Sequence, residues 1–209
     1  RYDVVGSFLR PEKLKQARKD YEAKKISKEE LTKVEDACIT DLIQKEKAAG
    51  LHVITDGEFR RATWHLDFMW GFDGVSHTPT KTGLPFHGEA AMIDDTYITG
   101  KVGVNGTHPF VEHFKFVKQF EDENTIAKQT IPAPAQFLEQ MILPFALENT
   151  KKYYEDTEEL VQDIANGYKV VIQQLYDAGC RCIQFDDCSW GMLVDEKAPL
   201  FFQTDQEGL

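Results

Sequence analysis

Residues 47–58 read KAAGLHVITDGE and residues 176–187 read YDAGCRCIQFDD. In both stretches an Ala-Gly pair that can end a helix is followed by a short apolar run with the character of a buried strand. Acidic residues come directly after each run. The shared pattern predicts a repeated unit of helix, strand and strand-end carboxylates. Such units imply a parallel sheet whose connections are right-handed helical crossovers.

The flanking sequence predicts the helices of these units. Ser27 followed by Glu30 is a capping-box pattern, and apolar residues at three- and four-residue spacing continue to Gly50, which can end the helix. Further helices are predicted over residues 11–25, 109–120, 134–147 and 157–175. Strands are predicted over residues 2–5, 51–55, 125–131 and 180–185.

Two architectures contain such units, a doubly wound open sheet and a (β/α)₈ TIM-type barrel. No glycine-rich phosphate loop follows the first predicted strand, which argues against a nucleotide-binding open sheet. Acidic groups at several strand ends favour the barrel, whose active sites lie at the C-terminal face. We therefore expect residues 1–209 to form one domain that covers roughly the first half of a barrel, with a β-rich antiparallel insertion at 70–106. The rest of the barrel is expected after residue 209.

The composition narrows the class of protein. Hydrophobic residues make up 42% and charged residues 28%, which is typical of a globular domain. The net charge of −11 opposes binding to nucleic-acid phosphates and to anionic membranes, so we expect neither partner. No apolar run approaches the roughly 18 residues that span a bilayer. The four cysteines are too few and too clustered for a disulfide scaffold, so a cytoplasmic protein is predicted, with an oligomer left open.

Four predicted strand ends carry candidate functional groups, and in a barrel they would converge on one cleft. They are Gly6-Ser7, Asp56 with Glu58, Pro132 to Gln136, and Asp186 with Asp187. Gly6 lets a ligand approach the backbone, and Ser7 offers a hydroxyl and an N–H to a carboxylate. Glu58 and Asp186 are the candidate catalytic residues, able to hold a substrate ammonium or to act as an acid–base pair.

Three further side chains, Arg61, His65 and Trp190, are assigned to the candidate substrate site as a polar and aromatic group. Structural explanations compete with this interpretation. Gly-Ser after a strand is often only a turn, and an aspartate at this position often caps the next helix. Glu58 could also form a surface ion pair with Arg60 or Arg61, which would contribute little.

The cysteines Cys180, Cys182 and Cys188 suggest a zinc site, but buried cysteines in a core strand are the commoner case. The sequence contains no His-x-Cys, His-Glu-x-x-His or Cys-x-x-Cys pair. It therefore predicts no metal site within this chain.

Four strings together resemble the catalytic barrel of the cobalamin-independent methionine synthases, in particular their shorter single-barrel relatives. They are VVGSFLRPEKL at 4–14, DGEFRRATWHLDF at 56–68, IPAPAQF at 131–137 and AGCRCIQFDDCSWGML at 178–193, in the order that the family has. The resemblance runs over nearly all 209 residues and implies a zinc-dependent methyltransferase that methylates homocysteine or a similar small thiol.

The resemblance also implies residue roles. The family's Ile-Gly-Ser, which holds the homocysteine carboxylate, matches Val5-Gly6-Ser7, and its two acids on the amino group match Glu58 and Asp186. Zinc lowers the pKa of the thiol so that it attacks as a thiolate. The family's zinc ligands would lie beyond residue 209, so we expect residues 1–209 alone to be inactive. The implied methyl donor is a methyltetrahydrofolate.

The sequence departs from the family at two strings. Asp-Glu-Pro becomes Asp186-Asp187-Cys188, and Thr-Gly-Pro becomes Pro132-Ala133-Pro134. The tryptophan that stacks on folate in the family falls near Gln140, which leaves the donor open between a folate, a corrinoid protein and another methylated compound.

Three other functions remain as alternatives. The first is a barrel glycosidase that uses Glu58 and Asp186 as its carboxylate pair, with Trp64, Trp70 and Trp190 as sugar-binding aromatics. The second is a decarboxylase of the uroporphyrinogen type, for which only Arg60 and Arg61 are near the predicted cleft. The third is a non-catalytic relative that binds a thiol amino acid.

Overall fold

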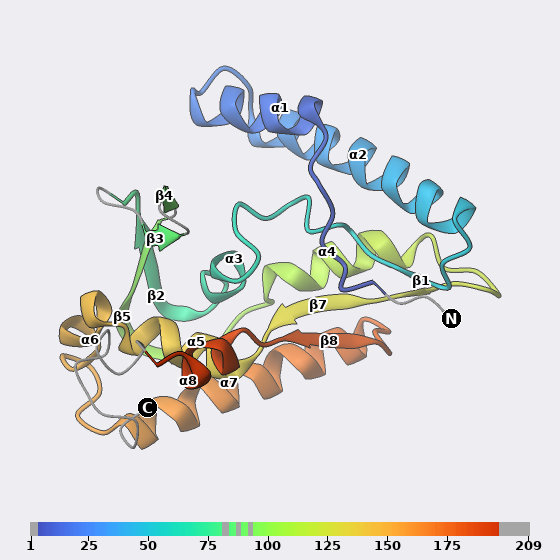
Figure 1. The fold of residues 1–209 in the computed structure, drawn as a ribbon. Helices are drawn as coiled ribbons and strands as arrows, with labels where there is room; N and C mark the ends of the chain where they lie inside the picture. The colour runs from blue at the N-terminus through green and yellow to red at the C-terminus, as the bar shows by residue number, and fades with distance from the viewer. Residues whose placement is uncertain (1–3, 81–83, 87–88, 92–93, 197–209) are drawn as a thin grey trace. The chain divides into compact units, whose positions relative to one another are not determined.

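The computed structural model describes residues 4–80, 84–86, 89–91 and 94–196 (Figure 1). Its contacts divide the chain into two compact units. Unit 1 comprises the described parts of Arg1–Trp64, Pro109–Thr130 and Leu175–Gln184. Unit 2 comprises those of His65–His108, Ile131–Gln174 and Phe185–Leu209. The expectation that residues 1–209 form a single domain stays a prediction.

Unit 1 combines helices with short parallel strands. Its elements are α1 (Glu12–Glu22), α2 (Lys28–Ala48), β1 (Val53–Ile54), α4 (Pro109–Lys118) and β6 (Ile126–Ala127). Strands β1 and β6 pair in parallel, with Val53 opposite Ile126 and Ile54 opposite Ala127. Helices α1 and α2 lie side by side, joined by a short turn (Figure 1).

Helix α2 begins and ends as its sequence predicts. The Ser27 hydroxyl accepts a hydrogen bond from the Glu30 N–H, and the Glu30 carboxylate accepts one from the Ser27 N–H, so the predicted capping box is confirmed. Gly50 follows the helix with φ +81°, the left-handed conformation that commonly ends a helix. The apolar stripe is buried and supplies much of the core of unit 1; it consists of Leu31, Cys38, Ile39, Leu42 and Ile43.

Unit 2 contains an antiparallel ribbon and most of the C-terminal helices. Its complete elements are α3 (Leu66–Met69), β2 (Asp73–Thr78), β3 (Leu84–Phe86), β4 (Glu89–Ala91), β5 (Asp95–Gly103), α5 (Pro134–Ile142), α6 (Pro144–Thr150) and α8 (Ser189–Val194). Strand β2 pairs antiparallel with β5, and β3 with β4, within the stretch 70–106 for which the sequence predicts small antiparallel strands.

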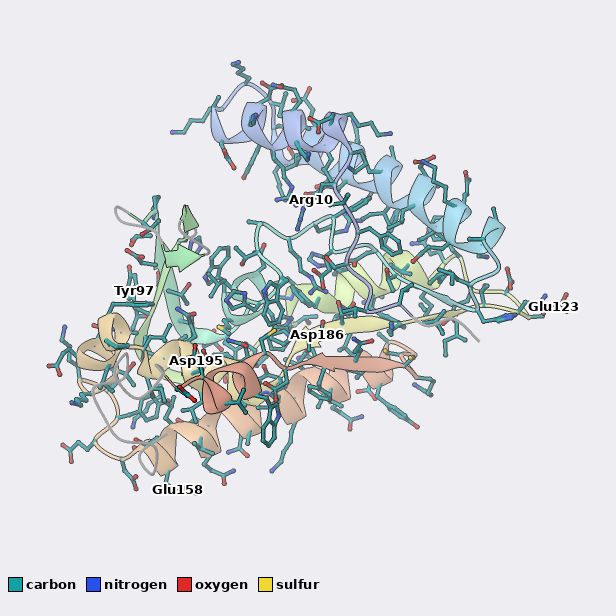
Figure 2. All side chains as sticks on the ribbon, viewed as in Figure 1. Arg10, Tyr97, Glu123, Glu158, Asp186 and Asp195 are labelled. Atoms are coloured by element: carbon teal, nitrogen blue, oxygen red, sulfur yellow. The ribbon has the colours of Figure 1, made fainter. Side chains whose placement is uncertain are left out.

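Three elements pass from one unit into the other along the chain: α7 (Thr157–Asp177), β7 (Gln129–Pro132) and β8 (Ile183–Asp186). Strands β7 and β8 pair with each other. The Gln129 N–H donates to the Cys182 carbonyl at 3.0 Å, and the Ala133 N–H donates to the Asp186 carbonyl at 2.8 Å. Asp186, the last residue of β8, is labelled in Figure 2.

The core of unit 2 is aromatic. Its rings are those of Phe68, Phe72, Phe137 and Tyr168, with centroids 5.0 to 6.4 Å apart in the paired contacts. His108 is fully buried among them, and its Nε2 lies 2.9 Å from the Phe68 carbonyl oxygen. The Tyr168 hydroxyl donates to the Pro132 carbonyl at 2.8 Å, so both polar groups of this core are hydrogen-bonded.

Several sequence predictions are corrected by the structure. The predicted helix 134–147 is two helices, because Pro144 lacks an N–H and disfavours a helical conformation at Leu143. The predicted strand 125–131 is two strands with different partners, β6 beside β1 and β7 beside β8. Cys180 and Cys182 precede β8 rather than lying in it. Of the predicted strand 2–5, residues 2–3 lie outside the described residues, and Val4 and Val5 are in no strand.

The α/β class is confirmed, whereas the predicted half barrel is not. The described residues form four two-stranded sheets, β1-β6, β2-β5, β3-β4 and β7-β8, and no closed barrel. Among the same residues, no helix is both long and apolar enough to cross a membrane.

Candidate functional site

The chain turns sharply after β1, and local hydrogen bonds define the turn. The Asp56 carboxylate accepts from the Glu58 N–H at 2.8 Å, and the Thr55 hydroxyl accepts from the Gly57 N–H at 3.1 Å. Gly57 has φ +65°, and a Cβ there would lie 2.4 Å from Leu42 Cδ2. This turn therefore requires glycine at its centre, and it directs the next residue, Glu58, away from the path of the strand.

Glu58 itself has φ +61°, one of two described non-glycine residues with a positive φ. The left-handed conformation is unfavourable for a residue with a Cβ and persists only where the surroundings hold it. Such backbone strain concentrates at ligand-binding and active sites. The backbone of Glu58 therefore marks this turn as a candidate site independently of its side chain.

The Glu58 carboxylate is buried, and its hydrogen bonds to the described residues reach only one of its two oxygens. Its Oε1 accepts from Arg61 Nη1 and from the Thr130 hydroxyl, both at 3.1 Å. Arg61 Nη2 in turn donates to the Thr130 carbonyl at 2.7 Å. Among the described residues, no hydrogen bond reaches the second oxygen, Oε2. That oxygen is therefore able to accept a hydrogen bond from a ligand.

Gly6 and Ser7 lie beside this turn. Ser7 forms a parallel bridge with Gly57, and the Phe8 N–H donates to the Gly57 carbonyl at 3.2 Å. Gly6 has φ +130°, and its carbonyl accepts from the Thr55 hydroxyl at 2.9 Å. Ser7 is exposed, so its hydroxyl is accessible next to the turn that carries Glu58.

A second buried carboxylate supports the same turn. Glu46 of α2 accepts hydrogen bonds from the Thr55 N–H at 3.2 to 3.3 Å and lies 3.3 Å from the Thr55 hydroxyl oxygen. Burial raises the pKa of Glu46 to about 7, and the neighbouring charge of Asp56 adds to the rise. Thr55 thus links Glu46 to the Gly6 carbonyl.

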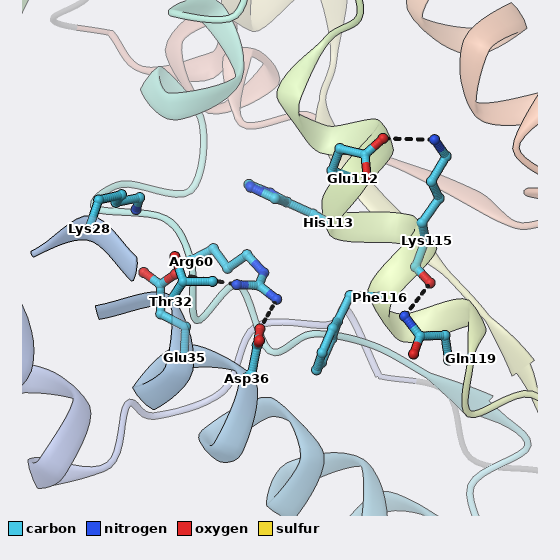
Figure 3. Close-up of a pocket in the computed structure, with 10 residues that line it drawn as sticks. All are labelled: Lys28, Thr32, Glu35, Asp36, Arg60, Glu112, His113, Lys115, Phe116 and Gln119. Atoms are coloured by element: carbon cyan, nitrogen blue, oxygen red, sulfur yellow. Dashed lines mark hydrogen bonds and ion pairs between the residues drawn. The ribbon is translucent and has the colours of Figure 1, made fainter. Parts of the chain in front are cut away.

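Arg60 and Arg61 point to different partners. Arg60 pairs with Glu35 and Asp36 of α2, and its guanidinium carbon lies 4.8 Å from the ring centroid of Phe116 on α4 (Figure 3). A pocket of about 400 Å³ opens beside this group. Glu58 pairs with Arg61, and both side chains are buried, so the alternative of a surface ion pair is wrong.

Three of the predicted site residues belong to unit 2. Asp186 is half-buried at the end of β8, and Trp190, on α8, is 67% exposed. His65 immediately precedes α3, and burial lowers its pKa to about 4, which keeps the imidazole neutral at neutral pH. Asp187 accepts from the Ser189 N–H at 2.9 Å and from the Ser189 hydroxyl at 2.5 Å, which is the helix-capping role weighed for a strand-end aspartate.

The structure thus brings together four predicted residues within unit 1: Gly6, Ser7, Glu58 and Arg61. Arg61 is turned toward Glu58 and Thr130, so its contacts favour a supporting role over direct substrate binding. Sequence reasoning did not identify Thr130 or Arg10, which donates to the carbonyls of Glu58 and Arg61. Neither residue carries a local signal, because each is distant in the sequence from the turn it contacts.

The described residues do not fit a zinc ion. Nowhere in the part of the chain that the structure describes do three His, Cys, Asp or Glu side chains come together as metal ligands. Cys180 is buried, Cys182 half-buried and Cys188 exposed. Burial and the charges of Asp186 and Asp187 raise the pKa of the Cys188 thiol, which disfavours the thiolate that zinc requires. The predicted stacking position, Gln140, is buried in α5.

Comparisons with known proteins find a family model, related sequences and a solved structure that resemble this chain. Residues 3–80 match the family described as cobalamin-independent synthase, catalytic domain. The chain is 38% identical over 197 residues to YxjH, named an uncharacterized protein, of Bacillus subtilis, and the match covers 94% of this chain and 50% of YxjH. A methionine synthase of Sulfolobus acidocaldarius is 26% identical over 189 residues, which cover 88% of this chain and 50% of that protein.

A solved structure is also similar. It is that of a protein from Listeria monocytogenes provisionally named a vitamin-B12-independent methionine synthase, with a TM-score of 0.72 and 38% sequence identity. The match covers 93% of this chain and 54% of that one. The chain therefore spans about half the length of the relatives it matches.

Proposed function

We propose that this chain, a relative of the cobalamin-independent methionine synthases, holds the amino-acid end of the substrate in an S-methyltransferase. The acceptor we propose is homocysteine or a similar small thiol, and the product methionine or the corresponding thioether. The relatives support methyl transfer at the level of the family. The barrel architecture and a folate-type methyl donor belong to the same proposal.

One observation carries the proposal: the parallel bridge between Ser7 and Gly57. It sets an exposed serine beside a turn whose next residue is the buried Glu58. A serine hydroxyl and N–H can bind a carboxylate, whereas a carboxylate oxygen without a hydrogen bond can accept one from an ammonium. An amino acid carries both groups on one carbon. Ser7 and Glu58 therefore match the carboxylate and the ammonium of a single ligand.

Holding the amino-acid end would contribute to catalysis by positioning. A thiol substrate fixed through its ammonium and carboxylate presents its sulfur in a restricted direction, which replaces a bimolecular encounter by a pre-oriented one. The fold around the Glu58 turn gives both Glu58 and Gly6 a positive φ. Asp186, by the resemblance of its string to the family's, is proposed as a second acceptor for the ammonium.

The test is calorimetry with L-methionine and two truncated analogues. 4-(Methylthio)butanoate lacks the amino group, and 3-(methylthio)propylamine lacks the carboxylate. We expect L-methionine to bind more tightly than either analogue. Glu58→Gln should weaken L-methionine by about tenfold, the loss of one charge-assisted hydrogen bond. It should leave 4-(methylthio)butanoate unchanged, because that ligand has no ammonium.

Glu35→Gln is the matched control, since Glu35 is also a buried glutamate paired with an arginine in unit 1. It should not change L-methionine binding. Equal binding of all three ligands by the unaltered protein would contradict the proposal. Hydrolysis of nitrophenyl glycosides is measured on the same preparation, and cleavage that depends on Glu58 would favour the glycosidase instead.

A further inference from the structure

The carbonyl oxygens of the Glu58 turn face arginines from a distant part of the chain. Arg10 Nη2 donates to the carbonyl of Arg61 at 2.8 Å and to that of Glu58 at 3.2 Å. Arg18 Nη2 donates to the carbonyl of Phe59 at 2.6 Å. Arg10 lies on the segment that precedes α1 and is labelled in Figure 2, and Arg18 lies on α1.

These contacts lie on residues 58–61, a second turn that begins at Glu58 and directly follows the turn after β1. The Arg61 N–H donates to the Glu58 carbonyl at 3.1 Å, and the Glu58 N–H donates to Asp56. Glu58 and Arg61 are the first and last residues of this turn, and a backbone hydrogen bond joins them. Arg10 therefore contacts the carbonyls of the same two residues. With this guanidinium removed, fewer interactions would oppose relaxation of Glu58 to a negative φ.

Arginine suits this role physically. Its guanidinium is planar, remains charged at all ordinary pH values and presents several donors in fixed directions. Hydrogen bonds from a charged donor are stronger than those between neutral groups. Arg10 donates to backbone carbonyls of the turn, whereas Arg61 and Thr130 bind the Glu58 carboxylate. Through these two contacts Arg10 acts on the backbone of the residue that carries the carboxylate.

We propose that Arg10 is a positioning residue for Glu58: by clamping the carbonyls of Glu58 and Arg61 it fixes the direction in which the carboxylate meets a substrate ammonium. The inference rests on the proposed function of Glu58. Under this inference the segment before α1 influences substrate selectivity through the backbone of Glu58.

The experiment compares binding of L-methionine with binding of 4-(methylthio)butanoate, which lacks the ammonium. The selectivity ratio is the affinity for L-methionine divided by that for the analogue. Arg10→Met should lower this ratio by about tenfold, because only the ligand with an ammonium depends on Glu58. Arg10→Lys keeps the charge but lacks the fork of donors, so it should lower the ratio by only about threefold.

Arg181→Met is the matched control. Arg181 also donates to two carbonyls, those of Tyr176 and Cys180, each at 2.8 Å, and it is exposed. Its replacement should leave the selectivity ratio unchanged. The inference would be overturned if Arg10→Met lowered the affinities for both ligands equally. It would also be overturned if Arg181→Met lowered the selectivity ratio as far as Arg10→Met does. Either result would indicate a general destabilisation of the structure.

Failure of the inference can be separated from failure of the proposed function. If Glu58→Gln lowers the ratio and Arg10→Met does not, Glu58 binds the ammonium but Arg10 does not position it. If Glu58→Gln itself leaves the ratio unchanged, the proposed function fails. Should Arg10→Met not fold, Arg10→Lys decides: a ratio that falls supports the inference, and an unchanged ratio overturns it.

Discussion

Arg61 Nη1 lies 3.1 Å from Glu58 Oε1, and the two side chains are only 1% and 2% exposed. Removing one partner of a buried ion pair leaves the other charge without compensation, which typically costs about 3 kcal/mol or more. We therefore expect Arg61→Met to lower the free energy of unfolding by about 3 kcal/mol, measured by urea denaturation. The guanidinium also packs 4.4 Å from the ring centroid of Phe110, so part of this loss is packing.

The double variant Arg61→Met with Glu58→Gln should recover part of that loss, because it removes the uncompensated charge as well. Lys45→Met provides the control, since the Lys45–Asp41 pair is largely exposed and should contribute less than about 0.5 kcal/mol. A double variant that is less stable than Arg61→Met alone would show that burial of the Glu58 charge is not the cause.

Glu46 gives a prediction for pH. Its folded-state pKa of about 7 lies above the ordinary value of 4.5, chiefly because of burial, with Asp56 raising it further and Lys128 lowering it. The folded state therefore binds the proton more tightly than the unfolded state. This contribution to stability is complete below about pH 4.5 and is lost as the pH rises through 7.

Glu46→Gln cannot lose a proton, so its stability should fall less than that of the unaltered protein between about pH 5 and pH 8. Over this interval the free energy of unfolding of the unaltered protein should fall by about 2–3 kcal/mol more than that of Glu46→Gln. Urea denaturation at several pH values measures it, with the exposed Glu148→Gln as control. Parallel stability profiles for Glu46→Gln and the unaltered protein would contradict the raised pKa.

Gly6 and Gly50 should respond differently to an added methyl group. Both have positive φ, +130° and +81°, but a Cβ on Gly6 would lie 2.7 Å from Thr130 Cγ2, whereas a Cβ on Gly50 meets nothing within 4 Å. Gly50→Ala should cost about 1 kcal/mol from backbone strain alone. Gly6→Ala should cost about 1–3 kcal/mol more, because the methyl group displaces Thr130 and because φ +130° lies further than φ +81° from the left-handed conformation that L-residues can adopt. Thermal unfolding of the two variants measures the difference, and equal losses would contradict this prediction.

The turn after β1 could be predicted from sequence because its causes are local. Asp56 accepts from the N–H two residues on, and Gly57 supplies the positive φ, so the string Asp-Gly-Glu carries its own geometry. The capping box of α2 is local in the same sense. The acidic residues after this strand predict Glu58 as a site residue, and the structure sets the predicted Ser7 next to its turn.

The support of Glu58 could not be predicted, because it depends on packing between distant segments. Thr130 is 72 residues from Glu58 in the sequence, and Arg10 is 48 residues away. Nothing in the local pattern of either residue selects that partner. The same holds for the strand predicted over 125–131, whose two halves pair with different strands. The break at Pro144, by contrast, had a local signal that the helical spacing of apolar residues outweighed.

Asp186 and its neighbour Asp187 allow a matched test of the remaining carboxylate. The backbone carbonyl of Asp186 accepts from the Ala133 N–H, so Asp186→Asn leaves that hydrogen bond in place. We expect Asp186→Asn to weaken L-methionine by about tenfold in calorimetry and to leave 4-(methylthio)butanoate unchanged, because that analogue has no ammonium for the proposed carboxylate to bind.

Asp187→Asn should change neither affinity, because an asparagine can still accept from the Ser189 N–H and preserve the start of α8. If Asp186→Asn and Asp187→Asn bind both ligands as the unaltered protein does, Asp186 has no part in holding the ammonium. Glu58 would then be its sole proposed acceptor. If both variants weaken both ligands equally, the cause is the start of α8, and the assignment of Asp186 is wrong.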